Sequence, residues 1–183
     1  CDVLYDLAFL LMDLCHRGFR GQANVVFATY LLQARGREDE GVIALPLFLA
    51  VRAAIRAMVL VQTDRATRAA GASTPEARQY LTEAIATLHP APPVLIAVGG
   101  VSCTGKTVLA HDIAPMQGAC PGAVHLRTDT ERKAPGARAV TYGAAARAAV
   151  YQGMLDRART LLLAGRSVVL DATFLDPGQR AAA

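Results

Sequence analysis

A glycine-rich segment directly after a short apolar run is the feature that most constrains this chain. Residues 94–98 read Val-Leu-Ile-Ala-Val, a run typical of a buried strand, and residues 100–107 read Gly-Val-Ser-Cys-Thr-Gly-Lys-Thr. The second segment fits G-x-x-x-x-G-K-[ST] at every fixed position, and the residues from Lys106 to Met116 favour a helix. A strand, a glycine turn and a helix in this order predict a parallel α/β sheet.

Each residue type in this loop is suited to binding phosphate groups. Glycine permits the backbone angles that aim several N–H groups into one concavity, and the following helix turns its positive end toward an anion. Lys106 adds a full charge, and the Thr107 hydroxyl is a suitable ligand for Mg²⁺. The sequence therefore predicts an ATP or GTP phosphate site, with Mg²⁺, formed by Gly100, Val101, Ser102, Cys103, Thr104, Gly105, Lys106 and Thr107.

Charge and composition agree with a phosphate pocket rather than a nucleic-acid tail. The chain of 183 residues carries a net charge of +4 without a run of basic residues, and 53% of its residues are hydrophobic, which is enough for a core. Of 19 basic residues only Lys106 and Lys133 are lysines. A chain that otherwise uses arginine has thus placed a lysine in the glycine-rich loop.

The chain divides into two parts with different periodicity. Residues 1–88 read as helices over 3–14, 23–34, 42–70 and 74–88, and the Pro-rich residues 89–93 read as a stiff linker. After the loop, strands are expected at 123–127 and 167–170, a helix at 144–164, and another helix from Pro177. We expect an all-helical segment (1–88) followed by an α/β domain with a parallel sheet (94–183).

Two carboxylates follow the predicted second and third strands. Ligands of open α/β sheets lie at the carboxyl ends of the strands, so Asp129 and Asp171 are expected beside the loop. Asp129 could take a proton from an attacking hydroxyl, Arg132 could hold an anionic group, and Asp171 could hold Mg²⁺. The structural alternatives are a helix cap with a surface arginine for the first pair and a turn-capping aspartate for Asp171. Thr173 and Arg180 are weaker candidates.

The four cysteines show no CxxC pair and no zinc spacing, which favours a reducing, cytoplasmic setting. Cys15 reads as a helix core residue and Cys103 as a small loop residue, with a reactive thiolate as the alternative for Cys103. The most apolar stretch, 42–61, is interrupted by Arg52 and Arg56, which argues against a membrane span. The chain begins without Met, and we expect a piece of a longer protein.

Residues 99–107, Leu126 to Asp129 with Arg132-Lys133, and Val168 to Phe174 with Gln179-Arg180 resemble a P-loop kinase module. The module is that of bacterial bifunctional aminoglycoside phosphotransferase/ATP-binding proteins, and it is similar to polynucleotide kinases and, more distantly, to gluconate kinases and zeta toxins. The resemblance implies that Asp129 is the base for a substrate hydroxyl and that Arg132 is the substrate-side arginine.

The front segment resembles the C-terminal helical end of the phosphotransferase-like domain of the same proteins, without its catalytic motifs. The resemblance implies that the last strands, an arginine-bearing lid and the adenine contacts lie beyond residue 183, so the sheet is expected to be truncated. Val108 and the short segment 133–136 depart from the family pattern.

These observations predict an ATP-dependent kinase that transfers the γ-phosphate to a hydroxyl on a small molecule or a nucleic-acid end. Catalytic roles fall to Lys106, Asp129 and Arg132, and metal contacts to Thr107 and Asp171. A nucleotide-binding regulatory module without transfer activity and an ATPase are the alternatives. The expected partner is a fused phosphotransferase-like domain, and no membrane is expected.

Overall fold

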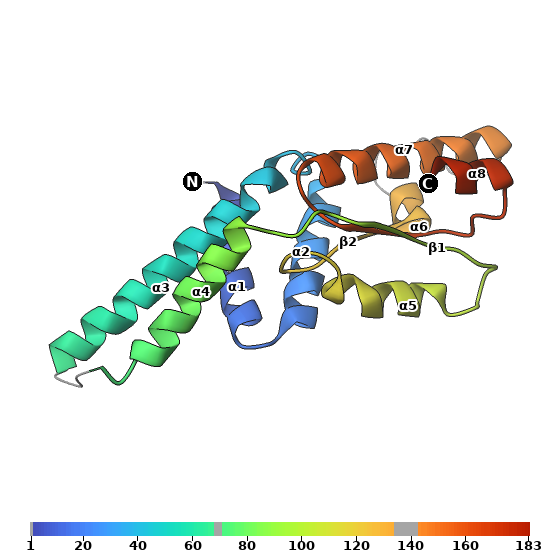
Figure 1. Cartoon of the computed structure of the whole chain (residues 1–183). Helices are drawn as coiled ribbons and strands as arrows, with labels where there is room; N and C mark the ends of the chain where they lie inside the picture. Colours follow the sequence, from blue (N-terminus) through green and yellow to red (C-terminus); the bar gives the residue numbers. More distant parts are fainter. Residues whose placement is uncertain (1, 68–70, 134–142) are drawn as a thin grey trace.

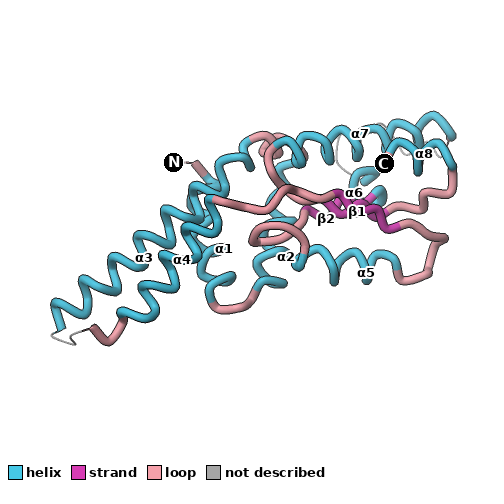
Figure 2. The backbone as a smooth tube through the Cα atoms, viewed as in Figure 1, coloured by secondary structure: helices cyan, strands magenta, loops and turns pink. Residues whose placement is uncertain are grey.

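The computed structural model describes residues 2–67, 71–133 and 143–183, and it consists of helices around a short parallel sheet (Figures 1 and 2). The helical segment comes first and the sheet with its helices second. In chain order the elements are α1 (Val3–His16), α2 (Arg20–Ala34), η1 (Gly41–Ala44), α3 (Leu45–Thr67), α4 (Thr74–Leu88), β1 (Leu95–Val98), α5 (Lys106–Ile113), η2 (Ala114–Met116), β2 (Val124–Arg127), α6 (Thr128–Lys133), α7 (Ala144–Leu163), β3 (Val168–Asp171) and α8 (Pro177–Ala182).

The sheet has the order β1-β3-β2, and both strand pairs are parallel. The chain crosses the sheet in one direction from β1 to β2 and in the other from β2 to β3. Because parallel crossovers are right-handed, these two connections place their helices on opposite faces. Figure 1 shows α5 on one face and α7 on the other. The predicted parallel α/β sheet preceded by helices is therefore confirmed.

Alternation along the strands divides the core between the two faces. Val168 and Leu170 of β3 pack with Val124 and Leu126 of β2 and with residues of α7 and the helical segment in one continuous apolar cluster. Val169 lies on the opposite face, in a smaller cluster that includes Val98 and α5. The helical segment thus shares its core with one face of the sheet.

The structure corrects several predicted helix boundaries. α1 ends at His16 rather than at residue 14, and α3 begins at Leu45, after η1, rather than at residue 42. α2 begins at Arg20, three residues before the predicted start, and Gly21 lies in its first turn, where backbone N–H groups need no helical partner. α5 ends at Ile113 and continues as the 3₁₀ turn η2, in which Pro115 has no N–H to donate. The predicted C-terminal end of the helix over 42–70, at residues 68–70, lies outside the described residues.

Helix α3 is long and apolar, and with η1 it gives the stretch Gly41–Thr67 the length and composition of a helix that could cross a membrane. One such helix is weak evidence for a membrane span, because core helices of soluble proteins have the same length and composition. In the structure α3 packs along α4 and against α1 (Figure 1). Arg52 lies over the ring of Tyr5 and pairs with Asp6 at 3.1 Å, which satisfies its charge at the helix surface.

The turn before β2 requires glycine at position 122. Gly122 has a φ of +110°, and a Cβ there would lie 2.7 Å from the backbone of Ala114 and Pro115. We expect Gly122→Ala to lower the free energy of unfolding by about 2 kcal/mol or more, because backbone strain and overlap add. Urea unfolding measures this.

The matched control is Gly153→Ala, at an open position of α7 where a Cβ meets nothing within 4 Å. There alanine should stabilise the helix by up to about 1 kcal/mol. Equal stability of the two variants would contradict this account of the turn.

Candidate functional site

The predicted phosphate loop, residues 100–107, connects β1 to α5 at the carboxyl end of β1. Three of its residues have left-handed backbone angles, with φ of +153° at Gly100, +65° at Cys103 and +81° at Gly105. These angles fold the loop back on itself, and the Thr104 hydroxyl donates to the Val101 carbonyl at 2.9 Å. The loop is also tied to the end of β3, because the Gly100 N–H donates to the Thr173 carbonyl at 3.2 Å.

The first turn of α5 is open to an anion. Gly105 occupies the N-cap position and provides no side-chain acceptor, so no side chain caps the N–H groups of the first turn. Lys106 Nζ donates to the Val101 carbonyl at 3.3 Å, which holds its charge over the loop. The loop thus combines uncapped N–H groups at the start of α5 with the ammonium group of Lys106, a combination that suits bound phosphates.

Thr107 and Asp171 come together although 64 residues separate them. The Thr107 hydroxyl donates to Asp171 Oδ2 at 2.6 Å, and Asp171 is buried at the end of β3. Parallel pairing puts Val98 and Arg127 level with Asp171, on the sheet face that α5 covers. The structure thus brings both predicted metal-binding residues to one point beside the phosphate loop. A hydroxyl and a carboxylate are oxygen ligands of the kind that Mg²⁺ prefers.

Two side chains of β2 flank this carboxylate, and the sequence interpretation missed them. His125 Nε2 and Arg127 Nε each lie 3.5 Å from Asp171 Oδ2. Burial lowers the pKa of His125, so its imidazole is neutral at pH 7, and Arg127 supplies the compensating positive charge. The alternation of Val124 and Leu126 with these two polar residues was the available signal, because it places them together on one face.

The predicted acceptor-side residues lie on α6, immediately after β2. Asp129 is in the first turn, with a side chain that is 63% exposed, and Arg132 Nη1 lies 4.0 Å from its carboxylate. Their spacing of three residues puts both on the same side of the helix. They are therefore close to each other, and they follow a strand that ends level with Asp171. The segment after Lys133, where the sequence departs from the kinase pattern, lies outside the described residues.

The two weaker candidates have structural partners instead. The Thr173 hydroxyl lies 3.0 Å from the Tyr151 hydroxyl, which also accepts from the Phe174 N–H at 3.2 Å. Arg180 Nη1 donates to the carbonyls of Phe174 and Leu175. Both residues stabilise the turn after β3, against which the phosphate loop rests.

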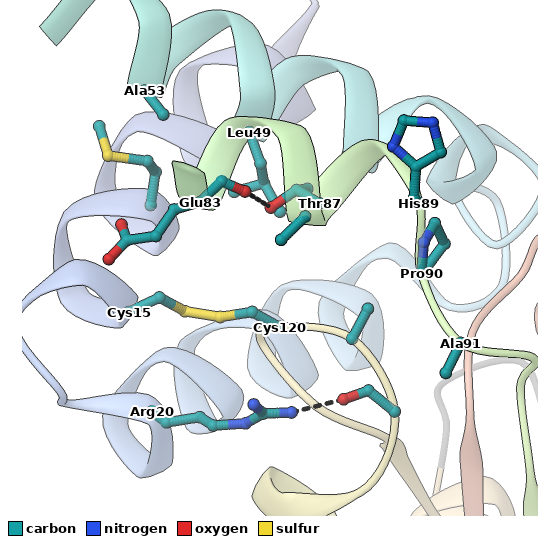
Figure 3. Close-up of a pocket in the computed structure, with 14 residues that line it drawn as sticks. Cys15, Arg20, Leu49, Ala53, Glu83, Thr87, His89, Pro90, Ala91 and Cys120 are labelled. Atoms are coloured by element: carbon teal, nitrogen blue, oxygen red, sulfur yellow. Dashed lines mark hydrogen bonds between the residues drawn. A yellow bond between two sulfur atoms is a disulfide. The ribbon is translucent and has the colours of Figure 1, made fainter. Parts of the chain in front are cut away.

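A separate cavity of about 380 Å³ lies between the helical segment and the loop before β2 (Figure 3). Its wall includes a disulfide between Cys15 and Cys120, which corrects the interpretation of Cys15 as a simple core residue. No local sequence pattern indicates this pair, because the two cysteines are 105 residues apart and meet only when α1 packs against that loop. The cavity lining comes from α1 to α4, the linker and residues 118–120, away from the phosphate loop.

Comparison with known proteins agrees with this geometry. Residues 95–183 match the family described as "AAA domain". The three-stranded parallel sheet with a glycine-rich loop between β1 and α5 agrees with a P-loop-like α/β domain in this part of the chain. The match covers the phosphate loop, Asp171 and all three strands, so we call residues 95–183 the P-loop domain.

The whole chain is similar to uncharacterized proteins of Mycobacterium bovis and of two strains of Mycobacterium tuberculosis. Each is 32% identical over 192 residues, with all of this chain and 37% of the relative covered. The chain thus spans about a third of the length of these relatives. The helical segment and the P-loop domain occur together in them. No solved structure matches the chain.

Proposed function

We propose that the P-loop domain belongs to an ATP-dependent phosphotransferase that acts on a hydroxyl group. The proposal rests on the 2.6 Å hydrogen bond from the Thr107 hydroxyl to Asp171 Oδ2. It lies beside the phosphate loop, in which three residues have left-handed backbone angles. A loop that receives phosphates next to a paired hydroxyl and carboxylate is the arrangement by which P-loop enzymes hold a nucleotide and its Mg²⁺.

The nucleotide side of the site uses the phosphate loop and α5. Backbone N–H groups of residues 100–107 would hold the phosphates, and Lys106 would balance their charge. Thr107 and Asp171 would hold Mg²⁺, which supplies charge neutralisation to the phosphates when it is bound. Among the described residues, Thr107, His125 and Arg127 all contact Oδ2 of Asp171, and this carboxylate would hold the metal or a metal-bound water. Catalysis would then consist mainly of positioning and electrostatic stabilisation.

The acceptor side of the proposed site is α6. Asp129 would accept the proton of the attacking hydroxyl, and its exposure leaves it accessible to an acceptor. Arg132, on the same side of the helix, would hold an anionic group of the acceptor or of the transferring phosphoryl. The proposed acceptor is a small molecule or a nucleic-acid end with a free hydroxyl, and a phosphotransferase-like domain in the full-length protein is the proposed partner.

Incubation with γ-labelled ATP and Mg²⁺ tests this function. The acceptor probes are gluconate, an aminoglycoside and a 5′-hydroxyl DNA oligonucleotide, and the label is followed into the acceptor and into free phosphate. We expect label in one acceptor and its loss in Lys106→Ala. ATP binding without transfer to any probe would favour the regulatory module. A steady release of free phosphate whose rate is the same with and without an acceptor, and which is lost in Lys106→Ala, would favour an ATPase.

A further inference from the structure

A buried carboxylate of the helical segment reaches into the P-loop domain. Asp39 lies between α2 and η1, and its side chain is 2% exposed. Its Oδ2 accepts a hydrogen bond from Arg157 Nε at 2.8 Å, and its Oδ1 accepts one from Arg157 Nη2 at 3.1 Å. This is the two-point arrangement that best fits a guanidinium and a carboxylate.

The same guanidinium holds a second carboxylate. Arg157, on α7, donates through Nη1 to Glu131 Oε1 of α6, so one arginine joins three segments of the chain. Burial alone would lower the pKa of Arg157, but the hydrogen bonds and charges of Asp39 and Glu131 more than offset it and raise this pKa. A buried charge that loses its partner is strongly unfavourable, so both carboxylates depend on Arg157 for a compensating charge.

Glu131 belongs to the short helix that carries Asp129 and Arg132. Successive helix residues are rotated by about 100°, so Glu131 lies on nearly the opposite side of α6 from Asp129. The Glu131 side chain is 17% exposed and points into the triad, whereas that of Asp129 is 63% exposed. The triad therefore holds the inner side of the helix whose outer side carries the two proposed acceptor-side residues.

A helix of six residues does not persist through its own hydrogen bonds. α6 contacts β2 and α7, and the Glu131–Arg157 pair is a charged tie between α6 and α7. The rotation of α6 about its axis then depends on the position of the Arg157 guanidinium, to which Glu131 is bound. The position of Arg157 depends in turn on Asp39, which fixes two of its three nitrogens.

We propose that Asp39 is a positioning residue through which the helical segment, by way of Arg157 and Glu131, sets the orientation of α6 and of Asp129 and Arg132. This inference rests on the proposed function for its catalytic meaning, since α6 matters to catalysis only if it receives the acceptor. In this arrangement the helical segment completes the acceptor side of the site, and the phosphate loop does not depend on it.

Hydrogen exchange of the backbone amides, followed by mass spectrometry, tests this inference. In Asp39→Asn we expect the amides of α6 to exchange at least about tenfold faster, because local opening becomes easier. The amides of β1 and β3 should be unchanged, and ATP affinity by calorimetry should stay within about twofold. In Asp39→Glu, which keeps the negative charge, the amides of α6 should exchange at a rate closer to that of the wild type.

Two further variants separate positioning from general damage. Asp6→Asn removes an exposed ion pair inside the helical segment and should leave α6 unchanged. Glu131→Gln leaves the Asp39–Arg157 pair intact and should loosen α6 without affecting α1 or α3. If the amides of α6 exchange in Asp39→Asn at the wild-type rate, the inference is overturned, whatever the result for Glu131→Gln. These readouts need no phosphoryl transfer, so an absence of transfer in the wild type would count against the proposed function alone.

Discussion

Asp129→Asn is expected to reduce phosphoryl transfer to a hydroxyl acceptor by about 10²–10⁴-fold while ATP affinity stays unchanged. Asparagine has nearly the same shape as aspartate, but its amide cannot take the proton of the attacking hydroxyl. The side chain lies on α6 and is 63% exposed, so its loss leaves no buried charge without a partner and should not alter the fold. Transfer of labelled phosphate from ATP measures the rate, and calorimetry measures the affinity.

The matched control for this variant is Asp112→Asn. Asp112 lies on α5 with a side chain that is 69% exposed, close to the exposure of Asp129, and its contact is with the neighbouring His111. Transfer should be unaffected in this variant. Full activity of Asp129→Asn would show that another group takes the proton. Loss of ATP binding in Asp129→Asn would instead mean that α6 contributes to the nucleotide side.

The parts of the fold that follow from local pattern could be predicted from the sequence. The run 94–98 and the glycines at 100 and 105 place the first strand, the loop and α5, because backbone geometry and helix ends act over a few residues. Asp2 is of a residue type that commonly caps helices, and its side chain accepts a hydrogen bond from the Leu4 N–H at 2.9 Å. The approach of Thr107 to Asp171 followed from the rule that parallel strands end at one edge of the sheet.

The parts that depend on packing between distant segments could not be predicted. The disulfide of Cys15 and Cys120 and the triad of Asp39, Arg157 and Glu131 each join residues that only the docking of the helical segment brings together. In the sequence these acidic and basic residues look like ordinary surface charges. Their pairing is decided by tertiary contacts that have no local periodicity.

Arg166 illustrates the same limit inside the P-loop domain. It precedes β3 in what reads as a polar turn, yet it is 1% exposed, and its Nη1 donates to the carbonyls of Ala119 and Cys120. Burial lowers the pKa of Arg166 to about 10, so the side chain stays protonated at pH 7 and can donate hydrogen bonds to the loop before β2. Strand propensity alone gives no reason to bury an arginine at this position.

Titration of ATP into the protein by calorimetry, with and without Mg²⁺ and beside Lys106→Ala, tests the central claim most directly. A charge-assisted hydrogen bond to phosphate contributes about 1.5–3 kcal/mol, so removal of the ammonium group should weaken binding at least about tenfold. Lys106 is partly exposed, and alanine suits the first turn of α5, so the variant should fold normally. The account predicts saturable binding that Lys106→Ala weakens to this extent. Equal affinity of the two proteins, or no binding to the folded wild type, would contradict it.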